Sequence, residues 1–304
     1  MRVSSTQYHI TVNASLQNSN AQLEKLMGQM STGNRLTRPS DDPIAHVRIS
    51  RLQREEASIA QYKDNIGALS SRMSQSETIM SSINADLLSA RDLLVWALDG
   101  GNSGEDLGAM ATNLASLRDA LYAGSLTKDQ EGTYLFSGTL SKTATVLYDA
   151  TAPAGSRYTV GGNAEQQQVV VGNGLTQPAN VTLGDEMSAM LNALDKAADA
   201  IQGGTTTAND PATRTVLLGA MGGVDTAMDQ VSTKISKLGG VQNIIGTLST
   251  DWNNLSTANK TAVLDYSQLD YSTAAVQLKT LVSAIEATQS AYGKVSKLSL
   301  FDAL

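Results

Sequence analysis

The chain has 304 residues, a net charge of −7, an isoelectric point near 4.9 and no cysteine. This acidic balance argues against a nucleic-acid partner and against an anionic membrane surface, because both require basic patches. The lack of cysteine excludes disulfides, iron–sulfur clusters and thiol catalysis, and His9 and His46 are the only histidines. We therefore expect no cofactor, no metal and no catalytic residue.

The start of the chain, MRVSSTQYHITVNASLQNSN, lacks the apolar stretch of a secretory signal. The longest apolar run of the whole chain, residues 93–98, is far too short to cross a membrane. We therefore expect any export to use a route that needs no cleaved signal peptide.

A narrow apolar stripe follows residues 12–30. It steps by alternating four and three through Val12, Leu16, Ser19, Leu23, Leu26 and Met30. Small polar residues interrupt it, which makes a stable isolated helix a poor prospect. The pattern predicts a helix that neighbouring segments complete.

The stretch after it reads as a helix–loop–helix connector. Gly33 and Asn34 suit the end of one helix, and Asp42 followed by Pro43 suits the start of the next. Asp41 and Asp42 could also suggest metal binding or acid–base chemistry, but no other ligand lies nearby in the sequence.

A seven-residue apolar repeat then dominates the chain and predicts a helix over 43–98, roughly 80 Å long. The repeat is formed by Leu52, Ile59, Ile66, Met73, Met80, Leu87 and Leu94. Gly100, Gly101 and Gly104 end this helix. A shorter helix follows, whose apolar positions are Leu107, Met110, Leu114, Leu117 and Leu121.

The middle of the chain has a different character. Residues 132–139, GTYLFSGT, predict a short strand bounded by glycines; a phosphate-binding loop would need a GK[ST] ending that is absent. Residues 138–184 are rich in Gly, Thr, Val, Gln and Asn, with strand-like runs at 158–160 and 169–171. We expect a small β-rich domain here.

The second half returns to helical repeats. From about Thr213, apolar residues recur every seven positions at Leu217, Val224, Val231 and Leu238, and the seam continues toward Leu269. The Gly239–Gly240 pair predicts a local bend, since each glycine costs about 1 kcal/mol against alanine. Two long helices from opposite halves predict an antiparallel bundle.

A last stripe occupies residues 274–295, with the same alternating spacing as the first. We expect both stripes to be solvated and mobile in a single chain and to be covered by other subunits. The predicted assembly interface consists of Leu16, Leu23, Leu26, Met30, Leu278, Leu281, Ile285, Tyr292 and Val295.

The fold class that these patterns predict is mainly α, a long antiparallel helical rod from both chain halves with a small inserted β-rich domain. Three domains are expected. Residues 1–40 with 265–304 form a terminal coiled coil that is disordered in the monomer. Residues 41–137 with 185–264 form a helical rod with a short hairpin, and residues 138–184 form a β-rich outer domain.

Both ends of the chain resemble the flagellin-like family of bacterial flagellar axial proteins. The N-terminal resemblance lies in MRVSSTQ and MSTGNRLTRPSDDPIA, and the C-terminal one in SAIEATQSAYGKVSKLSLFDAL. Within the family, GTYLFSGT and the Leu-Ser-Leu-Phe ending are closer to hook–filament junction proteins than to flagellins. The segment GGNAEQQQVVVGNGLTQPANVTLGD resembles the junction proteins' variable domain.

This resemblance implies an extracellular structural adaptor that joins the flagellar hook region to the flagellin filament, and no enzyme. It implies export through the flagellar type III apparatus, with a chaperone on the C-terminal segment. The implied partners are further copies in a ring, the hook-associated protein on the hook side, and flagellin on the other.

Three alternatives stay open at this point. Flagellin itself shares the ends and the fold class. A chemoreceptor-like signalling coiled coil would share the heptads but should carry membrane spans. An enzyme with a glycan-directed middle domain would need a nucleophile–base or metal constellation, and none is visible in the sequence. Subunit number and glycosylation are not predicted.

Overall fold

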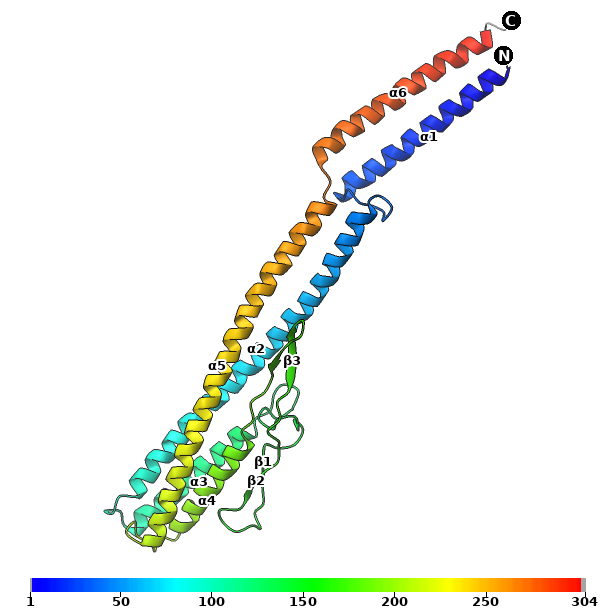
Figure 1. Cartoon of the computed structure of the whole chain (residues 1–304). Coiled ribbons are helices and arrows are strands. Elements are labelled where there is room, and N and C mark those ends of the chain that lie inside the picture. Colours follow the sequence, from blue (N-terminus) through cyan, green and yellow to red (C-terminus); the bar gives the residue numbers. More distant parts are fainter. Residues whose placement is uncertain (1, 302–304) are drawn as a thin grey trace. The chain divides into compact units, whose positions relative to one another are not determined.

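The structure is a computed structural model that describes residues 2–301, and side chains over 6–295. Figure 1 shows the elements in chain order. They are α1 (Arg2–Thr32), α2 (Pro43–Ala97), α3 (Gly104–Ser125), β1 (Val146–Tyr148), β2 (Tyr158–Val160), β3 (Gln168–Gly172), β4 (Leu175–Pro178), α4 (Gly184–Ile201), α5 (Pro211–Ser267) and α6 (Tyr271–Phe301). The prediction of a mainly α fold with a small β-rich insertion is confirmed.

The chain divides into two compact units, one from the residues up to Ser58 and from Asn254 onward, the other from Ile59–Asn253. The first, the terminal unit, holds α1, α6 and the adjoining ends of α2 and α5. The second, the central unit, holds everything between. The predicted division into three domains stays a prediction.

The heptad positions of α2 and α5 form the core of the central unit. Met80, Leu87 and Leu94 of α2 are fully buried, as are Leu217, Val224 and Val231 of α5. Polar pairs flank this core: Arg91 Nε lies 2.7 Å from an oxygen of Asp225, and the Gln242 amide donates to Glu77. The repeat therefore marks the buried face, as predicted.

Helix α5 continues through Gly239 and Gly240 without a break. The sequence predicted a bend there because glycine weakens a helix. Leu238 and Ile245 on either side are buried, and this packing stabilises the helix across the two glycines. A bend within the continuous helix stays a prediction.

Helix α4 lies in the range 185–264 that was assigned to the helical rod, but it was not predicted as a separate helix. It buries Met187, Leu191, Leu194 and Ile201, spaced at helical intervals, and packs along α3. Asp195 on the same helix has a fully buried side chain that pairs with Arg118 of α3 at 2.7 Å and with Arg157 at 3.1 Å. These ion pairs attach the loop between β1 and β2 to the helical core.

The strands form two antiparallel pairs, β1 with β2 and β3 with β4. Strand β2 has the predicted bounds, and β3 extends one residue beyond them at each end. The β3–β4 hairpin is held by side chains of the long helices: Asn65 donates to the carbonyl of Val170 at 2.8 Å and Trp252 to that of Val171 at 2.9 Å. The β3–β4 hairpin thus packs directly on α2 and α5, whereas β1 and β2 contact α4.

The strand predicted for residues 132–139 is shorter than expected. It is reduced to one antiparallel bridge between Tyr134 and Lys128, flanked by hydrogen bonds from Leu135 N–H to Thr127 O at 3.1 Å and from Asp129 N–H to Thr133 O at 2.9 Å. Gly132 and Gly138 both have positive φ, 78° and 73°, and the turns that they permit end the pairing on either side. Leu135 and Phe136 between these turns are buried.

Candidate assembly surface

Helices α1 and α6 lie side by side and share a narrow apolar seam (Figure 1). Leu26, Leu269 and Ala274 form its buried cluster, and Met30 and Leu278 pack against them. So small a seam buries little apolar surface. The free energy gained from this burial has to offset the conformational entropy that two long helices lose when they become ordered. The pair is therefore the part of the chain that gains most from further contacts.

The structure brings most of the predicted interface residues to this seam. Leu26 and Ile285 are buried; Leu16, Leu23, Met30, Leu278, Leu281 and Tyr292 are half-buried; Val295 is 40% exposed. Their role in assembly stays a prediction, as does the mobility of the free termini.

One expectation about these residues differs from the structure. Ile285 was expected to be solvated in a single chain, yet only 9% of it is exposed. The two terminal stripes have the same alternating spacing, so each can cover the other within one chain. The expectation that Ile285 is solvated in a single chain is therefore wrong.

Apolar residues also point away from the seam. Ile10 and Met27 of α1 are 58% and 57% exposed, and Val276 of α6 is 68% exposed. The outer sides of both helices therefore keep apolar surface available for burial by other molecules.

The N-terminal part of α1 is aligned with α6 by one aromatic contact. His9 Nδ1 lies 3.1 Å from the Tyr292 hydroxyl, and their rings meet edge to face with centroids 5.3 Å apart. This contact joins residues 283 positions apart and fixes which parts of the helices face each other.

Two connectors, residues 33–42 and 268–270, join the helix pair to α2 and α5, and we call them the connector pair. Leu269 N–H donates to Gly33 O at 2.9 Å, which bonds the connectors to each other, and Arg35 N–H donates to the carbonyl of Ser267, the last residue of α5, at 2.7 Å. Gly33 has φ 71°, and a Cβ there would lie 3.3 Å from the Tyr271 hydroxyl. Glycine at this position therefore permits both the left-handed turn and the close approach.

The two carboxylates of the first connector have structural partners. Asp42 caps α2 by accepting from Ala45 N–H at 3.0 Å, which is the largest cause that lowers its pKa. Asp41 accepts from Lys25 Nζ of α1 at 2.7 Å and from the backbone of Arg38, and these bonds lower its pKa well below the usual value. The connector prediction is confirmed, with Asp42 and Pro43 beginning α2.

The second connector carries a cap that the sequence reasoning missed. Asp270 accepts from the hydroxyls of Thr273 at 2.6 Å and Ser272 at 2.7 Å, which lowers its pKa to about 2. The sequence Asp-Tyr-Ser-Thr before an apolar stripe is an N-cap signal that would have placed the start of α6.

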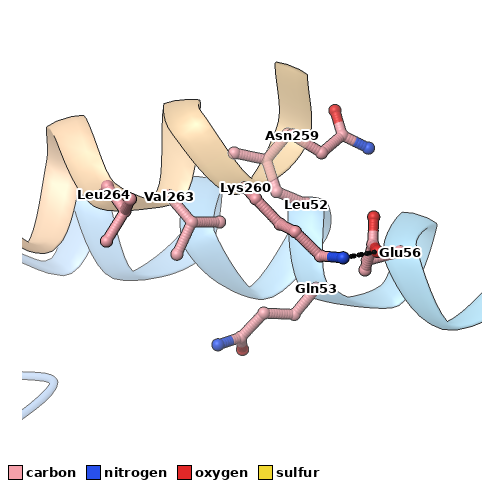
Figure 2. A pocket seen from close by; sticks show the side chains of 7 residues that line it. All are labelled: Leu52, Gln53, Glu56, Asn259, Lys260, Val263 and Leu264. Atoms are coloured by element: carbon pink, nitrogen blue, oxygen red, sulfur yellow. Dashed lines mark ion pairs between the residues drawn. The ribbon is translucent and has the colours of Figure 1, made fainter. Parts of the chain in front are cut away.

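The polar side chains in the α2–α5 seam of the terminal unit were also missed. Glu56 accepts from Ser256 at 2.5 Å and pairs with Lys260 at 3.1 Å. Figure 2 shows Lys260 reaching across from α5 to Glu56, with Leu52, Val263 and Leu264 nearby. Leu52, Val263 and Leu264 line a hollow of about 350 Å³ together with Gln53, Glu56, Asn259 and Lys260.

Two other features are absent from the described part of the chain. Among these residues, no group of three or more His, Asp or Glu side chains is placed to hold a metal ion. None of the helices over the described range is both long and apolar enough to span a bilayer.

Comparison with known proteins places the chain in a family. The model of the bacterial flagellin N-terminal helical region matches residues 3–141, and that of the C-terminal helical region matches residues 221–304. The chain therefore belongs to the flagellin-like family of flagellar proteins. It is a structural protein of the bacterial flagellum and not an enzyme, and its location is extracellular.

Within that family, the chain is similar to flagellar hook-associated protein 3. The protein of that name from Escherichia coli (strain K12) is 25% identical over 306 aligned positions, covering 93% of each chain. The one from Salmonella typhimurium (strain LT2) is 33% identical over 138 residues, which span 45% of this chain and 44% of that relative.

A solved structure shares the fold. It belongs to a protein of Vibrio parahaemolyticus, described as a candidate flagellar hook-associated protein. The two chains are 27% identical with a TM-score of 0.67, over 75% of this chain and all of the other.

Proposed function

We propose that the chain is the adaptor subunit that joins the flagellar hook region to the flagellin filament. The observation that carries this proposal is the similarity to a relative named flagellar hook-associated protein 3 over 93% of both chains. The narrow α1–α6 seam supports it, because such a pair gains stability when neighbouring subunits cover its outer side.

The proposed partners follow from this role. Copies of the chain form a ring, a hook-associated protein contacts the ring on the hook side, and flagellin contacts it on the filament side. The exposed apolar residues on α1 and α6 provide surface for these contacts.

Export belongs to the same proposal. The chain leaves the cell through the flagellar type III apparatus without a cleaved signal peptide, and a cytoplasmic chaperone covers the C-terminal segment that includes Leu278, Leu281 and Ile285. N-terminal sequencing of the protein from purified flagella tests whether a signal peptide is cleaved. We expect the sequence MRVSSTQ to be retained.

Electron microscopy of cells that lack this gene tests the adaptor role. The expected result is hooks without filaments, with flagellin released into the medium. Restoring the gene should restore the filaments. Full-length filaments in the deletion strain would contradict the proposal.

The second candidate function is flagellin itself, which the descriptions of both family models favour. If the chain were flagellin, the deletion strain would release no flagellin into the medium, whereas loss of an adaptor leaves flagellin to be released. The same experiment therefore separates the two functions.

A further inference from the structure

A cavity of about 310 Å³ lies between α3 and α4 in the central unit. Small side chains of both helices line it, together with Tyr148 at the end of β1; these are Ala111, Ala115 and Ala198. Ligand pockets in proteins span about 300–1,000 Å³, so this cavity has room for a ligand of one ring. The adaptor role, which concerns the terminal helices, makes no use of it.

A buried ion-pair network holds this cavity in shape. The side chain of Asp195 lines the cavity and is fully buried. Its oxygens accept from Arg118 Nη1 at 2.7 Å, from Arg157 Nη1 at 3.1 Å and from the backbone N–H of Gly155 at 3.0 Å. These donors come from α3 and from the loop between β1 and β2, so α4 is tied to both. A cavity that is formed in advance lowers the cost of ordering when a ligand binds.

The charges at the cavity are balanced. Two guanidiniums and two carboxylates line it, which are those of Arg118, Arg157, Asp195 and Asp199. Arg118 also pairs with Asp119 at 2.8 Å, so no excess positive charge is left to attract a phosphate or a carboxylate. Both arginines engage Asp195, which leaves Asp199 alone to hold a cation. The charges therefore favour an uncharged ligand.

Four polar side chains at the cavity are available to such a ligand. All are exposed, and within the side chains that the structure describes, 6–295, none of them makes a hydrogen bond; they are Thr112, Tyr148, Asp199 and Gln202. Together they offer two hydroxyls, a carboxylate that accepts and an amide that both donates and accepts. Sugar hydroxyls also donate and accept, so one sugar ring can use this mixed set.

Tyr148 adds an aromatic surface beside these polar groups. Its side chain is 48% exposed, and its ring is held by Tyr158 and Tyr122, with centroids 5.1 Å and 6.3 Å away. A pyranose ring carries C–H groups on one face, and such a face packs well on an aromatic ring, while the hydroxyls at its edge bind polar groups. The cavity therefore offers both kinds of contact that a sugar ring needs.

We propose that this cavity binds one uncharged sugar residue, with its C–H face on Tyr148 and its hydroxyls bonded to Asp199 and Gln202. This function goes beyond the adaptor role and does not rest on it. Because the protein is extracellular, the residue comes from a free sugar or from the end of a neutral glycan. With one ring and a few hydrogen bonds, the expected dissociation constant is on the order of 1 mM.

Saturation-transfer NMR on the full-length protein tests the proposal with the methyl glycosides of glucose, galactose, mannose and N-acetylglucosamine. At least one should bind, and the methyl glycosides of glucosamine and glucuronic acid, which are charged, should bind about tenfold more weakly. Binding of none of the uncharged glycosides, or tighter binding of a charged one, would overturn the proposal. Dextran or mannan, whichever matches the bound sugar, distinguishes the sources: its binding means that a glycan end is recognised.

Point variants test whether this cavity is the site. Asp199→Ala and Gln202→Ala remove groups that have no partner in the chain, so each should keep the thermal melt and weaken binding of that glycoside about threefold to tenfold. Tyr148→Ala should weaken binding more than Tyr148→Phe, which keeps the ring. Asp64→Ala and Gln75→Ala, the same changes at exposed positions of α2, are the matched controls and should have no effect. Unchanged affinity in both Asp199→Ala and Gln202→Ala would overturn the assignment.

Discussion

Single carboxylates determine where the helices begin and end at the connector pair. Asp41, Asp42 and Asp270 each accept several hydrogen bonds from nearby backbone and hydroxyl groups, and each has a lowered pKa. The residue type at each position was readable from the sequence, but only Asp42 was recognised as a cap. Asp41 bonds to Lys25, 16 residues earlier, and no local pattern predicts that contact.

The connector pair should loosen in acid. A folded-state pKa below the unfolded value means that the stabilisation is present above the unfolded pKa and is lost as the pH falls through the folded one. For Asp270 the interval runs from the ordinary value of 3.8 down to about 2. Circular dichroism melts at several pH values should show the terminal helices melting earlier across this interval. In Asp270→Asn this pH dependence should be weaker, and an unchanged dependence would contradict the assigned role.

At the scale of elements, the seven-residue repeat predicted α2 and α5 almost to the residue, because a long periodic pattern averages over local exceptions. The region of helix α4 was assigned to the helical rod, but α4 was not predicted as a helix of its own, because no seven-residue repeat marks it. The strand predicted within 132–139 is shorter than its alternating Tyr134, Leu135 and Phe136 suggest. The glycines on either side permit turns that leave a single bridge from Tyr134.

Replacing glycines inside α5 tests how much they weaken the helix. A Cβ at Gly239 or Gly240 would meet no atom within 4 Å, so Gly→Ala at each should raise stability by about 0.5–1 kcal/mol. Gly104→Ala is the control with the opposite expected result. It should lower stability, because its Cβ would lie 2.2 Å from Gly204 O and clash with it. Urea unfolding of the three variants measures both effects. Destabilisation by the α5 changes would indicate that the helix needs its glycines.

Two chemically identical substitutions separate the central core from the terminal seam. Ile66→Asp removes burial worth about 1.5–3 kcal/mol from a core residue that is 4% exposed, and adds a desolvation penalty. It should lower the melting temperature clearly, given total stabilities of about 5–15 kcal/mol. Ile285→Asp should change the monomer's main transition little, because the α1–α6 seam is small, but it should weaken chaperone binding and incorporation into flagella.

Exposed isoleucines serve as controls for this pair. Ile244→Asp in the central unit and Ile10→Asp on α1 introduce the same carboxylate at positions 47% and 58% exposed, and neither should shift the monomer's melt. Equal destabilisation by Ile66→Asp and Ile285→Asp would mean that the terminal pair belongs to one cooperative core with the rest of the chain.

At the scale of the whole molecule, the two units differ in how much apolar surface they bury within a single chain. The central unit fills its own core, whereas the terminal helices combine a narrow seam with exposed apolar surface. Limited proteolysis of the free protein should therefore leave a resistant core close to residues 41–264. Slow amide exchange within 12–30 and 278–295, as slow as in the central unit, would show that the termini need no partner.

The adaptor role makes a claim about position that labelling tests directly. Lys142, an exposed residue outside the long helices, can be replaced by cysteine as the single thiol of the chain and coupled to a gold-binding tag. Electron microscopy of labelled flagella should then show gold in one narrow band between hook and filament. Gold along the whole length of the filament would contradict the account and identify the chain as a filament subunit.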